Sequence, residues 1–336
     1  MDRIGPARYD PRGAGDPLSM PILNGLAAAL AWLGRQGTRA LAASIFLGLA
    51  VPPLAAYVKP YLGESVFVLL LFSYLRTDPA AFSRHLRSPG LTIVVSLWVM
   101  VAVPLIFGTV YVLSGIREAV PALYTIMILQ LAITPITSSA AFAALIGLDV
   151  ALSLAALIVC NALSPLTSVA FSYLFLGSSL FSPLELGIKL FLFFGSAGAL
   201  AFAIRRFAGQ SWIERQSEHI DGLNVLAVFL FAIAAMDGVP RQVAADPLFA
   251  IELVAFIIIL TCAQIGLSVL VFRRAGIDRG LVIGLLSGFR NIGLVMATLG
   301  ASLPDLAWFY FAVAQVPIYL MPAILRPLAR RLAEKR

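Results

Sequence analysis

The sequence has few charged residues: only 12% of its 336 residues are Asp, Glu, Lys or Arg, whereas 60% are hydrophobic and the mean hydropathy is +0.95. Soluble domains contain about 25% charged and 45–50% apolar residues. A globule of this size cannot hide that much apolar surface from water. The composition therefore excludes a water-soluble fold and predicts an integral membrane protein.

Cysteine and histidine are equally scarce. Cys160 and Cys262 both lie in apolar runs, and His85 and His219 both lie in charged segments between such runs. A disulfide framework or a zinc site needs more ligands than these, and the apolar runs contain no histidine as a general base. No nucleophile–base pair or phosphate-binding loop is recognisable. We therefore expect no enzymatic activity, no metal and no cofactor.

Long apolar runs dominate the rest of the chain. Residues 1–37 begin polar and rich in Gly and Pro, and their one apolar stretch is too short to cross a bilayer, so we expect a cytoplasmic tail with a short interfacial helix. Spanning-length segments, ten in all, follow at about 38–58, 60–76, 90–113, 119–147, 149–176, 182–204, 221–238, 247–272, 280–302 and 305–325.

The basic residues give an orientation. With the N-terminus inside, nineteen of the 24 Lys and Arg residues fall in inner loops or tails, three fall outside, and Lys189 and Arg290 lie within segments. This asymmetry predicts an all-α protein with ten transmembrane helices and both termini in the cytoplasm, in a bacterial inner membrane. The net charge of +7 follows from this distribution, so we expect the lipid bilayer and no nucleic acid as a partner.

Ten spans divide into five and five, and an odd number in each half gives the halves opposite orientations. This is the arrangement of inverted-repeat transporters. The predicted repeats are residues 38–177 and residues 178–336, the latter ending in a basic cytoplasmic tail. Segments two and seven each place an Asp and a Pro near the end of the segment, at LRTDPAAF and AMDGVPRQ, as a weak trace of the repeat.

Segments four and nine hold equivalent positions in the two halves, and both have polar interruptions. Pro135 cannot donate an amide hydrogen bond, and Gly288 and Gly293 flank a similar interruption. Two broken helices at symmetric positions predict a binding site at the membrane midplane, the alternative being ordinary proline kinks. The residues assigned to substrate binding are Thr134, Pro135, Thr137, Ser138, Ser139, Arg290 and Asn291.

Arg290 is the most informative residue of segment nine. A guanidinium at mid-membrane is costly and needs a partner or a task. It contacts either an anionic substrate or a structural partner such as a backbone carbonyl or one of Glu64, Asp149 and Glu252. A further polar core or ion site is predicted from the other buried polar side chains, Gln130, Ser153, Asn161 and Gln264.

Several motifs together resemble the bile acid:sodium symporter family. They are LRTDPAAFSRHLRSPG after segment two, GLDVALSLAALIVCNALSPL in segment five and GFRNIGLVMA in segment nine. The resemblance covers about residues 38–330. It implies a panel of segments 1, 2, 6 and 7 and a core of segments 3–5 and 8–10, in which broken helices cross. Substrate would enter between panel and core, and their relative movement would alternate access.

The sodium ligands that the resemblance implies are mostly missing. Their positions here are Val99, Ser139, Ala140, Ser153, Leu157, Leu286 and Arg290. Only Ser139 and Ser153 keep a ligand oxygen, whereas Arg290 replaces a glutamine and puts a fixed positive charge where the cation would bind. Sodium needs about five or six oxygen ligands. We therefore expect a sodium-independent member of the family, with Arg290 replacing the ion electrostatically.

The expected function is transport of a small organic anion by alternating access at a midplane crevice. Partial positive charge at the broken helix ends and the whole charge of Arg290 both favour an anionic substrate. One alternative is a sodium-coupled symporter that uses backbone carbonyls as ligands. Another is a membrane receptor or scaffold that does not transport. Arsenite efflux is disfavoured because the fourth segment has no cysteine at its break, TPITSS. Substrate identity and oligomeric state stay open.

Overall fold

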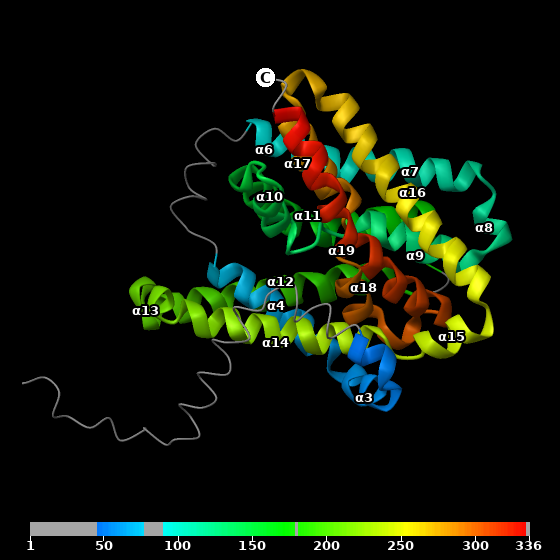
Figure 1. The fold of residues 1–336 in the computed structure, drawn as a ribbon, viewed down its shortest axis with the longest axis horizontal. Helices are drawn as coiled ribbons and strands as arrows, with labels where there is room; N and C mark the ends of the chain where they lie inside the picture. The colour runs from blue at the N-terminus through cyan, green and yellow to red at the C-terminus, as the bar shows by residue number, and fades with distance from the viewer. Residues whose placement is uncertain (1–45, 77–89, 179–180, 334–336) are drawn as a thin grey trace, which may run out of the picture.

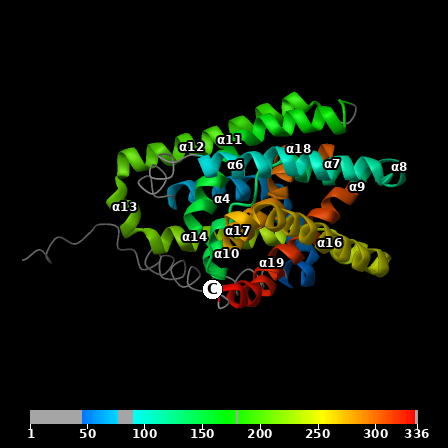
Figure 2. The same ribbon diagram turned by 90° about the horizontal axis from the view of Figure 1, so that it is seen from above.

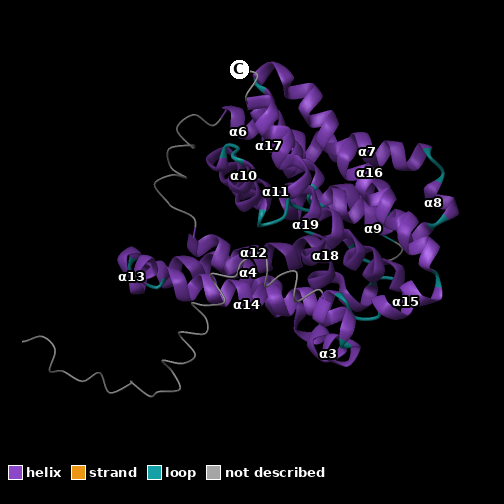
Figure 3. Ribbon diagram, viewed as in Figure 1, coloured by secondary structure: helices purple, strands orange, loops and turns teal. Residues whose placement is uncertain are grey.

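The structure is a computed structural model that describes residues 46–76, 90–178 and 181–333, so the predicted N-terminal tail, residues 1–37, lies outside the described residues. Helices make up nearly all of this part (Figure 3). Those of the first half are α3 (Pro52–Val58), α4 (Leu62–Arg76), α6 (Gly90–Leu97), α7 (Val103–Leu113), α8 (Ile116–Ala119), α9 (Pro121–Ala132), α10 (Ser139–Ile146) and α11 (Val150–Phe175).

Eight further helices follow along the chain. They are α12 (Pro183–Ala208), α13 (Gln210–Arg215), α14 (Ser217–Ala235), α15 (Val239–Ala245), α16 (Pro247–Phe272), α17 (Ile277–Gly288), α18 (Ile292–Leu299) and α19 (Asp305–Ala333). Single 3-10 turns lie at Lys59–Tyr61, Arg273–Ala275 and Gly300–Ser302, and a π-helical turn, Trp98–Ala102, joins α6 to α7.

Six helical runs of the described chain are long and apolar enough to cross a membrane: Pro52–Leu75, Gly90–Leu113, Val150–Phe175, Pro183–Ala208, Ser217–Ala245 and Pro247–Ala275. The protein is thus a helical membrane protein. The predicted fourth and ninth segments do not qualify by length because each is broken into two short helices. The apolar part of the tenth, Asp305–Ile318, is also short within the described residues.

The boundary predicted between the first two segments is wrong. Residues 52–76 are helical without an intervening loop, because the 3-10 turn at Lys59–Tyr61 continues the helical backbone from α3 into α4. The chain instead leaves the helical conformation at Val51, which precedes two prolines. A residue before proline is pushed away from the helical region, so Val51 marks the break.

Other helix starts follow directly from local sequence. Asp149, Ser182 and Asp246 are N-cap residues whose side-chain oxygens accept the backbone N–H three residues later, at the beginning of α11, α12 and α16. In α12 and α16 a proline occupies the first turn, where its missing N–H leaves no hydrogen bond unmade. These caps explain why the predicted segments begin within a residue or two of the observed helices.

The helices form two packed groups. The α4 group consists of α3, α4, α12 and α14: α4 packs on both α12 and α14, and α14 packs on α3. It lies in the lower half of Figure 1. The crossing group consists of α6, α7, α9, α10, α11 and α16 to α19, and most of it lies above. Between the groups, α11 and α12 run side by side in Figure 2, and α18 packs on α4 and α12.

Candidate functional site

Both predicted breaks are present, and they meet. The first separates α9 from α10 and the second separates α17 from α18. The two extended links pair as a short antiparallel bridge between Pro135 and Arg290. The N–H of Ile136 donates to the carbonyl of Phe289 at 3.0 Å, and the N–H of Asn291 donates to the carbonyl of Thr134 at 2.9 Å. The breaks are therefore not simple proline kinks.

Side chains of α11 satisfy the polar groups of the first break. Asn161 Oδ1 accepts the Thr134 hydroxyl at 2.7 Å, and Ser164 Oγ accepts the Thr134 N–H at 3.2 Å. Thr167 and Ser168, about one turn further along α11, donate to the carbonyl of Ala132, at 3.0 and 3.3 Å. All of these side chains are buried. The hydroxyls and amide of α11 thus replace the hydrogen bonds that a continuous helix would have made.

Arg290 is 1% exposed, and its guanidinium lies among three backbone carbonyls. Nε donates to Ser287 at 2.9 Å, Nη1 donates to Ile133 at 3.0 Å, and Nη2 donates to Val99 at 2.6 Å. Nη1 also lies 3.6 Å from the sulfur of Met100. We call the carbonyls of Val99, Ile133 and Ser287 the carbonyl cage.

Each carbonyl of the cage lacks its helical partner for a local reason. Within the π-helical turn, Val103 donates to Trp98, and the residue five after Val99 is Pro104, which has no N–H. Ile133 is extended and follows the last residue of α9. Asn291, which would donate to Ser287 in a continuous helix, donates to Thr134 instead.

None of the three carboxylates proposed as partners pairs with Arg290. Asp149 caps α11, and the side chains of Glu64 and Glu252 are exposed. Within the described residues, the guanidinium bonds only to the cage and to Met100. The sequence left open whether Arg290 contacts an anionic substrate or a structural partner. In this structure its guanidinium is capped by backbone carbonyls. One cation thereby satisfies three buried acceptors, each of which would cost about 1–3 kcal/mol if left unpaired.

A cavity of about 70 Å³ adjoins the breaks. It lies between the α4 group and the crossing group, and Arg290 borders it. Its other lining residues are Val66, Leu69, Ile136, Thr137, Val228, Phe231, Asn291, Ile292, Gly293, Gln315 and Ile318. Thr137 lies just before α10, and Asn291 is the N-cap of α18, so polar groups at the start of a half-helix from each break face the cavity. We call it the break cavity.

A second and larger cavity, of about 690 Å³, lies further along α4 and α18. Leu62, Phe67, Phe193 and Met296 form much of its apolar wall, and Glu64 contributes a carboxylate. At its edge, Lys59 Nζ lies 2.9 Å from Asp237 Oδ2 and 4.4 Å from the ring centre of Trp308. Both cavities therefore follow the contact between the two helix groups.

The remaining predicted residues are buried but divided among separate sites. Gln130 accepts a hydrogen bond from the Tyr310 hydroxyl, which ties α9 to α19. Gln264 Oε1 has no partner among the described residues. Ser153 lies near the start of α11, and its hydroxyl makes no hydrogen bond to the break residues. Ser139 donates to Ile136 within the first break at 2.7 Å. Of this set, only Asn161 and Ser139 join the break residues.

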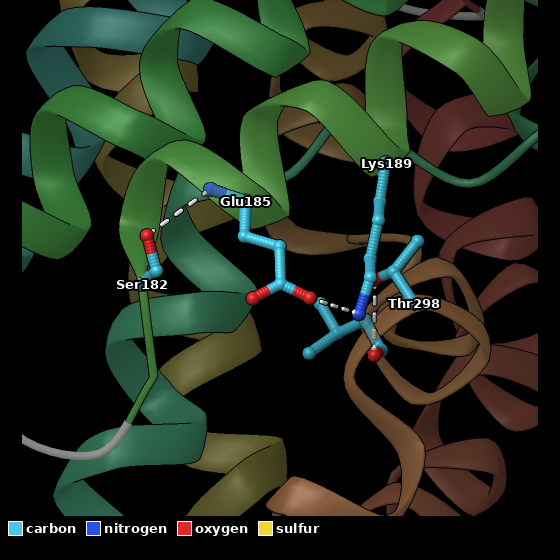
Figure 4. A network of polar contacts seen from close by, with 5 residues as sticks. Ser182, Glu185, Lys189 and Thr298 are labelled. Atoms are coloured by element: carbon cyan, nitrogen blue, oxygen red, sulfur yellow. Dashed lines mark hydrogen bonds and ion pairs between the residues drawn. The ribbon is translucent and has the colours of Figure 1, made fainter.

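The other intramembrane cation, Lys189, has a local partner. Its Nζ lies 2.7 Å from Glu185 one turn earlier in α12, and both side chains are about half exposed. Figure 4 shows this pair beside the Ser182 cap. The charge of Lys189 is therefore balanced by a neighbour outside the break site. Arg290, in contrast, is buried and has no acidic neighbour among the described residues, so its charge calls for a functional explanation.

Several residues of the site were missed by the sequence analysis. Ile133 and Met100 contact Arg290 but carry no sequence signal of their own, and Val99 was named only as a position that lacks a family sodium ligand, not as a partner of Arg290. Pro104, inside an apolar run, was an available signal for a free carbonyl nearby. Phe231 and Val66 line the break cavity from the α4 group, and their apolar side chains resemble any other core residue.

Comparison with known proteins adds no assignment. Family models give no match to this chain, and a search of curated proteins finds no significant similarity.

Proposed function

We propose that this protein is a secondary transporter that moves a small organic anion by alternating access and that it works without bound sodium. The observation that carries the proposal is the burial of the Arg290 guanidinium in the carbonyl cage, where two broken helices meet. On the motifs of segments two, five and nine, the sequence resembles the bile acid:sodium symporters. Ten spans, the inverted repeat and cytoplasmic termini belong to this proposal.

The cage supports the absence of sodium. In transporters with broken helices, unwound backbone carbonyls coordinate the coupling ion. Here three such carbonyls accept hydrogen bonds from one guanidinium, including that of Val99, the position of a family sodium-ligand glutamine. A sodium ion close to Arg290 would also meet a like charge in a medium of low dielectric constant. Arg290 therefore serves as a permanent replacement for the ion.

The break cavity supports an anionic substrate. The start of α18 and the link before α10 line it, and partial positive charge from unpaired N–H groups collects at such helix starts. Arg290 adds a full charge at its border. The opposite wall is apolar, with Val66, Leu69 and Phe231. This combination suits an anionic head attached to an apolar body.

The division into helix groups supports movement. The α4 group corresponds to the panel that the resemblance implies, and the crossing group corresponds to the core. Both cavities lie where α4 faces α18, so displacement of one group against the other would change access to the break residues. A receptor or scaffold would not require two cavities on this boundary.

Thermal unfolding of the purified protein in detergent tests the proposal, with sodium chloride titrated against potassium chloride at constant ionic strength. A ligand that binds only the folded state raises the unfolding midpoint. We expect no difference between the salts for the wild type and a sodium-specific rise for Arg290→Gln, whose cage is open to an ion. Arg274→Gln, at an exposed arginine, is the control and should respond like the wild type.

Sodium stabilisation of the wild type would contradict the proposal and favour a sodium-coupled symporter. The second arm uses proteoliposomes without sodium, loaded with methanesulfonate, an anion that stays ionised at every accessible pH. We expect efflux or exchange of the anion that needs the protein. Binding without any flux would favour a receptor or scaffold.

A further inference from the structure

The break cavity is too small for its proposed substrate. It encloses about 70 Å³, whereas binding sites for small organic ligands usually enclose about 300–1,000 Å³. If an organic anion binds at the breaks, as the proposed function holds, a group that now fills the site must withdraw. The wall facing the second break contains one large aromatic side chain, Phe231.

The Phe231 ring lies so close to Gly293 in the second break that a larger side chain at position 293 would collide with it. A Cβ atom on Gly293 would lie 2.8 Å from Cε2 and 3.0 Å from Cζ of the ring, closer than carbon atoms normally approach. Phe231 is 8% exposed, and its ring packs against the ring of Phe311 in a T-shaped contact, with 5.5 Å between centres and 74° between planes. Gly293 thus provides the space that the ring occupies.

The two partners belong to different helix groups. Phe231 lies on α14 in the α4 group, and Gly293 lies in the first turn of α18 in the crossing group. The ring therefore stays on one side of the boundary when the groups move apart, while the glycine and the break residues stay on the other. Separation of the groups would vacate the volume beside Asn291 and Gly293.

From this geometry, we propose that Phe231 is the residue that sets the size of the transported anion. Its ring borders the part of the break cavity where the apolar body of the substrate binds, and a side chain at position 293 would force the ring to shift. The anionic head binds beside Asn291, and the length of the apolar body is limited by the space that the ring leaves. This inference rests on the proposed transport of an organic anion.

Straight-chain alkanesulfonates from methanesulfonate to hexanesulfonate test the inference by thermal unfolding in detergent, with chloride keeping the ionic strength constant. We expect the wild type to prefer the shortest chains. In Phe231→Ala, each added methylene that the enlarged cavity buries should raise the affinity about fourfold. Phe231→Trp should shift the preference in the opposite direction, toward methanesulfonate alone.

Phe311→Ala is the matched control. It removes the other ring of the same aromatic pair, and Phe311 is buried but does not line the break cavity. It should lower stability while leaving the chain-length preference of the wild type. If Phe231→Ala binds sulfonates with an unchanged preference, the size-setting role of Phe231 is wrong and the anion site stands. If no sulfonate stabilises the wild type or any variant, the proposed anion transport and this inference both fail.

Discussion

The two breaks, one in each half of the chain, share one backbone design. In each break a half-helix ends in an extended link, and a second half-helix of eight residues, α10 or α18, follows the link. The links bond to each other through Ile136 and Phe289 and through Thr134 and Asn291. Each break therefore provides hydrogen-bond partners for backbone groups of the other.

Their side chains differ in kind. The first break relies on neutral groups of α11, with Asn161 and Ser164 on Thr134 and with Thr167 on Ala132. The second break contributes a charged group, Arg290, which bonds across to the first break at Ile133 and to the π-helical turn at Val99. The first break both donates hydrogen bonds to α11 and accepts them from it, whereas the Arg290 side chain of the second break only donates.

This difference shows how two paired breaks can hold a single cation without a bound ion. A metal ion at a crossing is held by ligands from several elements, and its loss leaves those ligands unpaired. A guanidinium in the same place is covalently attached to one break and cannot dissociate. The energetic coupling between the halves is then built into the chain, and we expect it to persist in any salt.

The largest predicted effect comes from removing the charge of the second break. Arg290→Met leaves three buried carbonyls without a donor, and because each costs about 1–3 kcal/mol, we expect a loss of about 3 kcal/mol or more in the free energy of unfolding. Unfolding of the purified protein by sodium dodecyl sulfate in mixed micelles measures it.

Arg290→Lys separates charge from shape in that experiment. The ammonium keeps the charge and three donors but lacks the planar fork that reaches Ser287, Ile133 and Val99 together. Its stability should fall between those of the wild type and Arg290→Met. Equal stability of Arg290→Met and the wild type would mean that the carbonyl cage does not hold the breaks together.

A smaller effect is expected at the first break, whose polar side chains are neutral. Thr134→Val removes the hydroxyl that bonds to Asn161 and leaves a buried amide oxygen unpaired, which should cost about 1–3 kcal/mol. Asn161→Leu in the same chain removes the unpaired group, so the double variant should recover part of the loss. A double-mutant cycle on the same unfolding assay would show additive losses if the two side chains were not coupled.

The positions of both breaks could be predicted from the sequence, because their causes are local. Pro135 cannot continue a helix, and Gly288 with Gly293 weakens one. Ser139 was also expected at the site, whereas Asn161 was assigned to a separate polar core or ion site. The unusual burial cost of Arg290 marked it as a residue that needs partners.

The partners themselves could not be predicted, because they are backbone atoms and distant in sequence. Val99 and Ile133 lie more than 150 positions before Arg290, and their carbonyls become available only through the local geometry around Pro104 and Pro135. A search for acidic side chains led instead to Glu64, Asp149 and Glu252. The role of Phe231 depends on the approach of its ring to Gly293, which the sequence pattern of an apolar residue does not reveal.

The smallest predicted effect compares the starts of the two half-helices that follow the breaks. Asn291 caps α18 by accepting the N–H of Leu294 at 3.3 Å, whereas Ser138 at the start of α10 makes no such bond. Asn291→Ala should therefore cost about 1 kcal/mol of unfolding free energy, and Ser138→Ala should cost almost nothing. Equal losses would contradict the difference between the breaks, since they would mean that both half-helices depend on their own side chains. A loss of stability for Asn291→Ala alone would show that the second break caps α18 with its own side chain, in addition to supplying Arg290.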